Sequence, residues 1–381
     1  MSTSRRDWLM GVGALAAGAA FASREAEANA RRRYAQPEPK PQTPVKQPNG
    51  PVQILVSLRE QKLWVYDKDG LMETTTVSTG TGGYPTPTGV FSILEKSVRH
   101  FSNIYGGAPM PYMQRLTMSG VALHQGVVTG RPASHGCVRL PPSFAPQLYQ
   151  MTKIGARVMI MHGEAKPVEI AHPALFVAKP IPVVKPEDMP EASDKAKAIA
   201  ASVSKDLEAA VMLARIGSIT AWRREELRKL PVSVFVSKAE GRMYVRHGFS
   251  PLFDVPVTVA DPDKRIGTHV YTVLEPKGDA GEMRWSVVTL DNEGAPPQIE
   301  PQMSARRGRA ARAPEPAPIV TAALQGPAST ASEALDRLTL PEEARARVCD
   351  MLAVGASLIV SDEGPSHEMR VSGTDFVVLV R

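Results

Sequence analysis

Hydrophobic positions occur in short runs over most of the chain, from residue 51 onward. The runs are rich in β-branched and aromatic residues and are separated by Asp, Gly and Pro, a pattern typical of closely spaced strands joined by turns. Strands are predicted over residues 52–58, 63–67, 73–78, 90–94 and 157–161. The pattern therefore predicts a mainly β fold.

One short helix is predicted just before the last of these strands. It opens at residues 142–146 and extends to about residue 152, with Phe144, Leu148 and Met151 spaced to form one buried face. Gly155 then ends the turn that leads into the strand. We expect this helix to support the loop that precedes it.

The strand pattern repeats within the chain. Laid on itself without gaps, the sequence matches residues 51–57 with 231–237, and in a second block it matches residues 155–160 with 355–360. Two ungapped matches in the same order argue against chance similarity between β-rich segments. The sequence therefore predicts one fold used twice, with an insertion in the second copy.

Composition divides the rest of the chain. Residues 31–50 form a Pro-rich basic linker, and residues 165–230 are first Pro-rich and then rich in Ala, Lys, Glu and Leu, which predicts a helical linker. The second copy spans residues 231–381, and its Arg-, Ala- and Pro-rich insertion lies near 299–320.

The net charge of +6 belongs to two of these linkers. Residues 31–50 hold five basic residues and one acidic residue, and residues 299–320 hold four basic and two acidic residues. The folded parts are thus neutral overall, and because the chain has no nucleic-acid-binding motif, no nucleic-acid partner is expected. A hydrophobic fraction of 43% excludes a wholly disordered protein, and only two cysteines exclude a disulfide scaffold.

Residues 1–30 are similar to a twin-arginine export signal. Arg5 and Arg6 precede an apolar stretch, residues 8–22, and small residues suited to a signal peptidase follow at 26–30. An uncleaved anchor is the alternative, although about fifteen apolar residues fall short of the roughly twenty that span a membrane. The sequence predicts export to the periplasm or cell envelope and no membrane span in the mature protein.

The candidate chemistry lies in residues 123–126, Leu-His-Gln-Gly, and residues 133–141, Ala-Ser-His-Gly-Cys-Val-Arg-Leu-Pro. A cysteine is a nucleophile only as its thiolate, so Cys137 needs a neighbouring base, and His124 and His135 are both candidates. Gly136 allows a tight turn in which the N–H groups of residues 136 and 137 could form an oxyanion hole.

Basic residues near the cysteine suit an anionic substrate. Arg139 can offer a bidentate fork to a carboxylate, and Arg131 is a weaker candidate for the same role. Each assignment has an alternative: Arg139 as a surface ion-pair partner, Cys137 as an inert buried residue, or the two histidines and the cysteine as zinc ligands without a convincing fourth.

The Ser-His-Gly-Cys-x-Arg string with its upstream histidine resembles the active-site signature of the L,D-transpeptidase (YkuD-like) family. Residues 84–91, Tyr-Pro-Thr-Pro-Thr-Gly-Val-Phe, resemble the Thr-Pro-x-Gly turn of that family. The resemblance implies a β-rich catalytic domain over residues 51–164. It also implies a cysteine transpeptidase that cross-links peptidoglycan stem peptides without a metal or cofactor.

The resemblance assigns roles to six residues. Cys137 is the nucleophile, His124 the proton acceptor and donor, and His135 shapes the site. Gly136 belongs to the oxyanion hole, and Arg139 and Ser134 bind substrate. Alternatives with the same motif are an L,D-carboxypeptidase, which uses water as acceptor, and a noncatalytic wall-binding or scaffold protein.

The second copy lacks these groups. In the alignment that lays residues 155–160 on 355–360, His124 falls on Leu324, Cys137 on Arg337 and Arg139 on Thr339. Residues 231–381 are therefore predicted to be a degenerate, inactive copy that docks on the first, binds glycan or recruits a cell-wall protein partner. Cys349 lies in a helix-like stretch, 342–352, where packing is its expected role.

Overall fold

The computed structural model describes residues 45–178, 230–278, 281–290, 327–370 and 373–380. The predicted export signal, residues 31–44 of the linker 31–50, the helical part of the linker 165–230 and the insertion 299–320 lie outside the described residues. No helix in the described ranges is long and apolar enough to cross a membrane.

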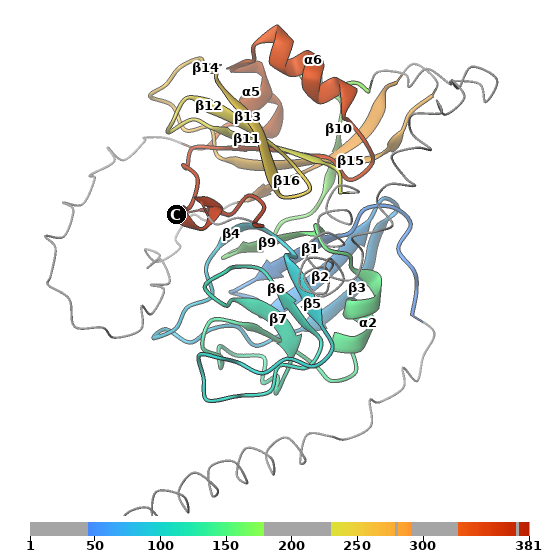
Figure 1. Cartoon of the computed structure of the whole chain (residues 1–381), viewed down its shortest axis with the longest axis vertical. Helices are drawn as coiled ribbons and strands as arrows, with labels where there is room; N and C mark the ends of the chain where they lie inside the picture. Colours follow the sequence, from blue (N-terminus) through green and yellow to red (C-terminus); the bar gives the residue numbers. More distant parts are fainter. Residues whose placement is uncertain (1–44, 179–229, 279–280, 291–326, 371–372, 381) are drawn as a thin grey trace, which may run out of the picture. The chain divides into compact units, whose positions relative to one another are not determined.

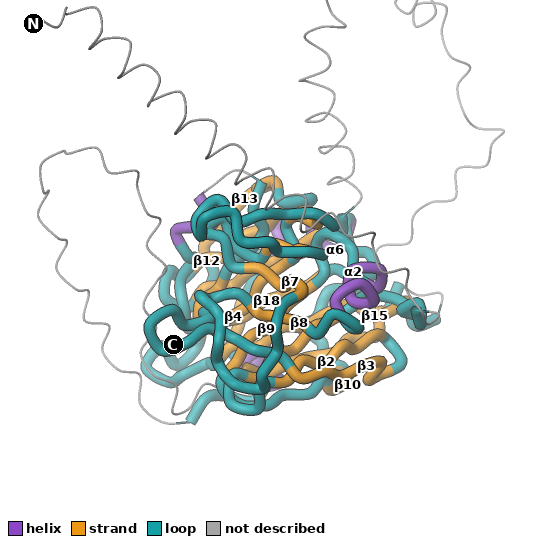
Figure 2. The backbone as a smooth tube through the Cα atoms, turned by 90° about the horizontal axis from the view of Figure 1, so that it is seen from below, coloured by secondary structure: helices purple, strands orange, loops and turns teal. Residues whose placement is uncertain are grey.

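The chain forms two compact units. Of the described residues, one unit holds Val45 and Phe101–Pro109, and residues 101–109 form a loop closed by a hydrogen bond from Ser102 N to Ala108 O of 2.8 Å. The other unit, Lys46–His100 with Met110–Arg381, contains every sheet and helix described below. Figure 2 shows that strands and loops make up most of the described chain, with few helical turns.

Two halves of the chain, residues 46–178 (the first half) and 230–381 (the second half), each contain one large sheet. The first-half sheet has six strands in the order β19-β4-β9-β1-β2-β3. Figure 1 labels the five of these strands that come from the first half. Its strands are β1 (Gln53–Ser57), β2 (Lys62–Asp67), β3 (Gly70–Thr76), β4 (Gly89–Ser92), β9 (Arg157–Met161) and β19 (Val378–Leu379). β1 pairs antiparallel with β2 and parallel with β9. The first five of these strands form close to the predicted bounds, whereas β19 comes from the far end of the chain.

A second, four-stranded sheet lies in the same half and is called the site sheet here. Its order is β5-β6-β7-β8, formed by β5 (Glu95–Ser97), β6 (Met113–Arg115), β7 (Ala122–Gln125) and β8 (Val138–Leu140). The predicted helix follows as α2 (Ala145–Met151) and buries Leu148 and Met151. Lys96 in β5 caps the C-terminal end of this helix, because its Nζ donates to the carbonyl oxygens of Tyr149 and Thr152.

The second-half sheet has seven strands in the order β10-β16-β15-β18-β11-β12-β13. Its strands are β10 (Val168–Ile170), β11 (Val232–Ser237), β12 (Arg242–His247), β13 (Ser250–Pro256), β15 (Thr268–Pro276), β16 (Met283–Leu290) and β18 (Ser357–Ser361). The same half holds β14 (Thr258–Val259) paired with β17 (Leu338–Thr339), the helices α5 (Ala331–Asp336) and α6 (Glu342–Asp350), and a 3-10 turn η3 (His367–Arg370).

The two large sheets share their pairing pattern. β11 pairs antiparallel with β12 and parallel with β18, as β1 does with β2 and β9. A register shift follows Val65 in β2 and Val245 in β12, two positions that the sequence repeat aligns. The bridge between Ser78 and Arg139 likewise has its counterpart in the pairing of Thr258 with Thr339.

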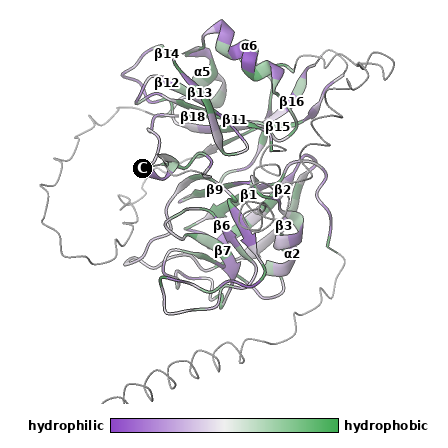
Figure 3. Cartoon of the chain, viewed as in Figure 1, coloured by the Kyte–Doolittle hydropathy of each residue, from purple (hydrophilic) through white to green (hydrophobic). Residues whose placement is uncertain are grey.

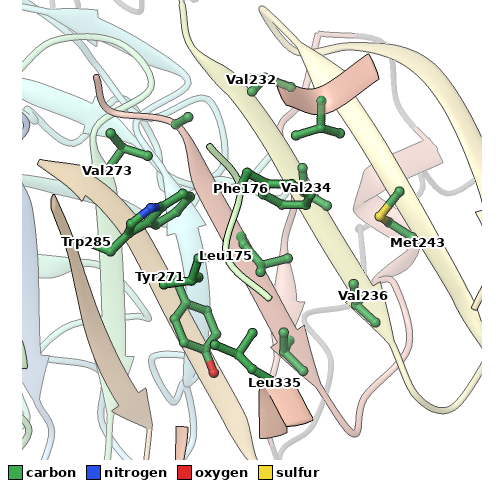
Figure 4. Close-up of a cluster of buried hydrophobic side chains, with 14 of the residues drawn as sticks. Leu175, Phe176, Val232, Val234, Val236, Met243, Tyr271, Val273, Trp285 and Leu335 are labelled. Carbon is green, nitrogen blue, oxygen red and sulfur yellow. The ribbon is translucent and has the colours of Figure 1, made fainter. Parts of the chain in front are cut away.

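The core of the second half lies between its sheet and its helices, and Figure 4 shows much of this cluster. Tyr271, Val273 and Trp285 come from the sheet, and Leu335 comes from α5. Phe176, from the stretch predicted as a linker, is 1% exposed in the same cluster. Figure 3 shows the corresponding hydropathy, with apolar colour along the central strands and polar colour over much of α6.

A second cluster joins the two halves. It contains Leu55, Val90 and Met159 from the first-half sheet together with the residues that the sequence repeat aligns with them, namely Phe235, Val270 and Ile359. All six side chains are at most 1% exposed. Corresponding faces of the two sheets are therefore buried against each other, in the way that identical surfaces meet in a two-fold dimer.

Each half also adds a strand to the other sheet. β10, near the C-terminal end of the first half, pairs with β16 at the edge of the second-half sheet. β19, in the C-terminal segment (residues 366–380), pairs with β4 at the edge of the first-half sheet. A Cβ at Gly89 would collide with the carbonyl oxygen of Val378, so this close pairing requires glycine.

Candidate active site

The predicted base lies on β7 of the site sheet, and the predicted nucleophile directly precedes the neighbouring parallel strand, β8. β7 pairs with β8 so that Leu123 lies opposite Val138 and His124 opposite Arg139. Side chains alternate between the two faces of a strand, which gives residues 122, 124, 137 and 139 the same face. Cys137 packs against Ala122, in agreement with this register. The register therefore brings Cys137 and His124 to one face, one strand apart.

His124 is held as a neutral imidazole of defined tautomer. Burial lowers its pKa to about 4, with a smaller contribution from the nearby Arg139 charge. Nδ1 lies 2.8 Å from the carbonyl oxygen of Gln125, which can only accept, so Nδ1 carries the hydrogen. Nε2 is then the nitrogen with a free lone pair, as a general base requires.

Cys137 carries a half-buried thiol. It is partly buried against Met110, Met113 and Ala122, and its Sγ lies 3.6 Å from the carbonyl oxygen of Gly120. Burial raises the pKa of the Cys137 thiol, although a hydrogen bond with the Ala122 backbone and, to a smaller extent, the charges of Arg139 and Arg115 oppose this rise. The resting state is therefore a neutral thiol with a neutral imidazole, and the proton has to move when the sulfur reacts.

The loop before Cys137 is fixed by hydrogen bonds of its own. Ser134, 2% exposed, donates from Oγ to the carbonyl oxygen of Cys137 and accepts from Gly136 N at 3.2 Å. Gly136 has a φ of +106°, a conformation that favours glycine. The N–H of Gly136, one of the two predicted oxyanion donors, donates to Ser134 within the loop. The N–H of Cys137, the other predicted donor, takes no part in these loop hydrogen bonds.

Thr86, in the turn of residues 84–91, supports the same loop. Its Oγ1 donates to the carbonyl oxygen of Gly136 at 2.8 Å and accepts from Gly80 N at 2.8 Å. The sequence marked this turn by its motif but gave no role to Thr86, since a contact between segments so far apart in the chain has no local signal.

The remaining predicted site residues border the loop. His135 is exposed, and its ring centroid lies 4.6 Å from that of Tyr84. Arg139 is half-buried, with its side-chain carbons against Gly126, and no carboxylate among the described residues forms an ion pair with it. Arg131 is exposed. Within the described ranges no three His, Cys, Asp or Glu side chains are grouped to hold a metal ion.

Residues 51–160 match the family model of the L,D-transpeptidase catalytic domain (YkuD). Among solved structures, an L,D-transpeptidase (Yku) from Stackebrandtia nassauensis is 33% identical over 31% of this chain and 58% of that chain, with a TM-score of 0.28. An L,D-transpeptidase from Mycobacterium smegmatis is 22% identical over 29% of this chain and 59% of its own, with a TM-score of 0.28.

An L,D-transpeptidase from Xylanimonas cellulosilytica is 22% identical over 31% of this chain and 64% of that chain, also with a TM-score of 0.28. The chain thus spans less than two thirds of each of these structures. No curated protein matches the chain.

Proposed function

We propose that the protein is a cysteine L,D-transpeptidase that acts on peptidoglycan stem peptides. The observation that carries the proposal is that Cys137, directly before β8, shares a face with His124 on the paired strand β7, and that Nε2 of a neutral His124 is free to accept a proton. The match of residues 51–160 to the catalytic-domain family supports the same reaction class.

In the first step Cys137 Sγ attacks the carbonyl carbon of the L,D peptide bond in a donor tetrapeptide. Nε2 of His124 takes the thiol proton as the carbon–sulfur bond forms, and delivers it to the nitrogen of the departing D-alanine. The products of this half-reaction are a thioester on Cys137 and free D-alanine. The raised thiol pKa means that this transfer accompanies the attack, because little thiolate is present beforehand.

In the second step an amine from a neighbouring stem attacks the thioester carbonyl. His124 takes a proton from that amine, and a proton returns to the sulfur as the carbon–sulfur bond breaks. The new amide is the cross-link. Both steps pass through an oxyanion, for which the N–H of Cys137 is the proposed donor.

Arg139 is the proposed contact for a substrate carboxylate. Its guanidinium has no ion-pair partner among the described residues, and it extends from the strand that follows Cys137. Stem peptides carry carboxylates that fit its planar fork. We assign His135, exposed beside Tyr84, to the shaping of the cleft wall, and Ser134 to holding the nucleophile loop for substrate.

An L,D-carboxypeptidase remains the closest alternative, since water in place of the amine in the second step would give hydrolysis. A noncatalytic wall-binding or scaffold protein is opposed by the complete set of reactive groups around Cys137. Export through the twin-arginine-type signal, with the reaction in the periplasm, is part of the proposal because peptidoglycan lies outside the cytoplasmic membrane.

The second half is proposed to be a degenerate copy of the first. Its support is the shared strand order, together with a register shift and a cross-bridge that recur at positions aligned by the sequence repeat. Arg337 stands where Cys137 stands in the first copy, and it donates to backbone carbonyl oxygens such as that of Ala260. In this proposal the position of the nucleophile has become a structural one.

A carbapenem tests the enzyme against the scaffold. Mature protein incubated with a carbapenem is expected to gain the mass of one β-lactam, and Cys137→Ala is expected to lose this adduct completely because the acylated sulfur is gone. Cys349→Ala, which removes the other, partly buried cysteine, is the matched control and should react like the wild type. A folded, reduced protein that forms no adduct would overturn the assignment.

Product analysis separates transfer from hydrolysis. With disaccharide tetrapeptides as donor and acceptor, the proposal expects cross-linked dimers whose formation needs Cys137. Accumulation of tripeptide without dimers, even at high acceptor concentration, would favour the carboxypeptidase.

A further inference from the structure

A buried carboxylate from the C-terminal segment contacts the turn between β6 and β7 in the first half. Glu368, 3% exposed, accepts from Met118 N at 2.7 Å through Oε2 and from Ser119 N at 3.2 Å through Oε1. A buried carboxylate is costly unless hydrogen bonds satisfy it, and two backbone N–H groups do so here. The two side-chain oxygens therefore fix the turn at consecutive residues.

The next residue of this turn touches the nucleophile. Gly120 follows Ser119, and its carbonyl oxygen is the partner of Cys137 Sγ at 3.6 Å. The other groups of the turn bond among themselves: Thr117 Oγ1 accepts from both Ser119 Oγ and Val121 N at 2.9 Å. One of the two amides that Glu368 holds, that of Ser119, thus directly precedes Gly120, whose carbonyl oxygen faces the thiol.

The segment that carries Glu368 is itself anchored to both halves. Arg246 in β12 donates from its guanidinium to the carbonyl oxygens of Met369 and Thr374 and lies over the ring of Phe376. On the other side, Thr88 Oγ1 donates to the carbonyl oxygen of Val380 at 2.9 Å. The second half thus fixes the C-terminal segment, and Glu368 on that segment fixes the turn beside Cys137.

We propose that Glu368 is a positioning residue for the Cys137 thiol, acting through the Met118–Gly120 turn. The proposal rests on the proposed function, in which Cys137 is the nucleophile. It gives the second half a specific role: although it has no nucleophile of its own, it supplies a group that orients the nucleophile of the first half.

Removing the carboxylate has opposite effects on two reactions of the thiol. In Glu368→Gln the amide presents one oxygen and one NH₂ group to two N–H donors, so one bond is lost and Gly120 O is released. The S–H···O bond stabilises the neutral thiol, so its loss favours the thiolate. The charged or titratable groups that face the thiol otherwise, Arg139, Arg115 and His124, are unchanged.

The experiment compares alkylation and acylation in the full mature chain. Alkylation of Cys137 by iodoacetamide, followed across pH in a Cys349→Ala background, is expected to be roughly threefold faster at neutral pH in Glu368→Gln, with its pH midpoint lowered. Acylation by a carbapenem is expected to be roughly tenfold slower, because the sulfur is no longer fixed on the face that Cys137 shares with His124. Hydrogen exchange of the peptide over residues 116–121 should be faster.

Two further variants complete the design. Glu343→Gln removes an exposed carboxylate from α6 and should leave both rates as in the wild type. Glu368→Asp keeps the charge but shortens the side chain by one methylene, and it should slow acylation even if Glu368→Gln is too unstable to assay.

The inference is overturned if the Glu368 variants match Glu343→Gln in both rates, or if both rates fall together with the folded fraction. A wild-type protein that is alkylated normally but never acylated would instead contradict the proposed function. In that case the alkylation profile alone would still test the role of Glu368.

Discussion

His124 illustrates how burial sets the chemistry of a single residue. An exposed imidazole with a pKa near 6.5 is part-charged at neutral pH, whereas burial lowers the pKa of His124 to about 4. The Nδ1 hydrogen is committed to the carbonyl oxygen of Gln125. The side chain is therefore present as a base over the whole neutral and mildly acidic range.

The pH dependence of acylation follows from this pKa. Protonation of Nε2 removes the acceptor, and with a pKa lowered to about 4 this loss begins only as the pH falls toward 4. The carbapenem acylation rate is expected to show no acid limb at pH 6.5 and to fall tenfold per unit below about pH 4. Stopped-flow fluorescence or rapid-quench mass spectrometry would measure the profile.

An acid limb near pH 6.5 would contradict the burial of His124 in the reacting enzyme. The control is His135→Gln, which changes an exposed histidine of the same site. This variant should show the same fall in acylation rate below about pH 4 as the wild type.

At the residue scale the motif led to the proposal of Cys137 as nucleophile and His124 as base. It could not give the tautomer of His124, because that depends on the direction of one backbone carbonyl. It placed Ser134 with the substrate, whereas the structure has its hydroxyl inside the loop between Gly136 N and the carbonyl oxygen of Cys137. Glu368 had no signal at all, since its partners Met118 and Ser119 lie in the other half of the chain.

At the element scale the sequence located the long apolar strands but not the short ones. β1, β2, β4 and β9 are visible as runs of buried side chains. β10 and β19 have three and two residues, and they exist because a sheet edge in the other half offers them partners. Tertiary pairing rather than local propensity forms such strands.

Arg157 in β9 shows how tightly these elements are tied together. Its guanidinium forms an ion pair with Asp375 at 3.0 Å and donates to the hydroxyls of Ser92, Ser233 and Ser357. Both charged side chains are at most 5% exposed. Because the sequence repeat aligns Ser357 with Arg157 itself, the network sits where corresponding positions of the two halves meet.

Breaking this ion pair is expected to destabilise the chain strongly. Arg157→Met leaves the Asp375 carboxylate buried without its cation, which typically costs about 3–5 kcal/mol of unfolding free energy. Arg242→Met, which breaks an exposed pair with Asp254, is the control and should cost less than about 1 kcal/mol. Urea denaturation followed by circular dichroism measures both, and equal small losses would show that Arg157 does not hold the halves together.

At the scale of the whole molecule the two halves depend on each other. The buried cluster takes Leu55, Val90 and Met159 from one sheet and the corresponding positions from the other, so each face is covered by the opposite half. The shared strand pattern was readable from the sequence because the apolar runs recur in order. Docking of the second copy on the first was one of three predicted roles, but the faces that meet were not predicted, because an apolar face on a strand does not reveal what covers it.

A separated first half should therefore fail to remain soluble. Residues 46–178 alone would expose the apolar face of β1, β4 and β9, leave the β4 edge unpaired and leave Arg157 without Asp375. Co-expression with residues 230–381 on a second chain restores the covering sheet, β19 and Glu368 together. We expect the two pieces to copurify as a one-to-one complex that a carbapenem acylates, while the first piece alone aggregates.

Shortening the second piece separates its two roles, which are to cover the apolar face of the first half and to position Cys137. A shorter partner, residues 230–365, keeps the second-half sheet but lacks Glu368 and β19. If it binds the first piece yet supports slower acylation, then the second-half sheet covers the apolar face of the first half, and the C-terminal segment orients Cys137. A soluble, fully reactive first piece would refute the dependence, because every buried contact with the second half would then be dispensable.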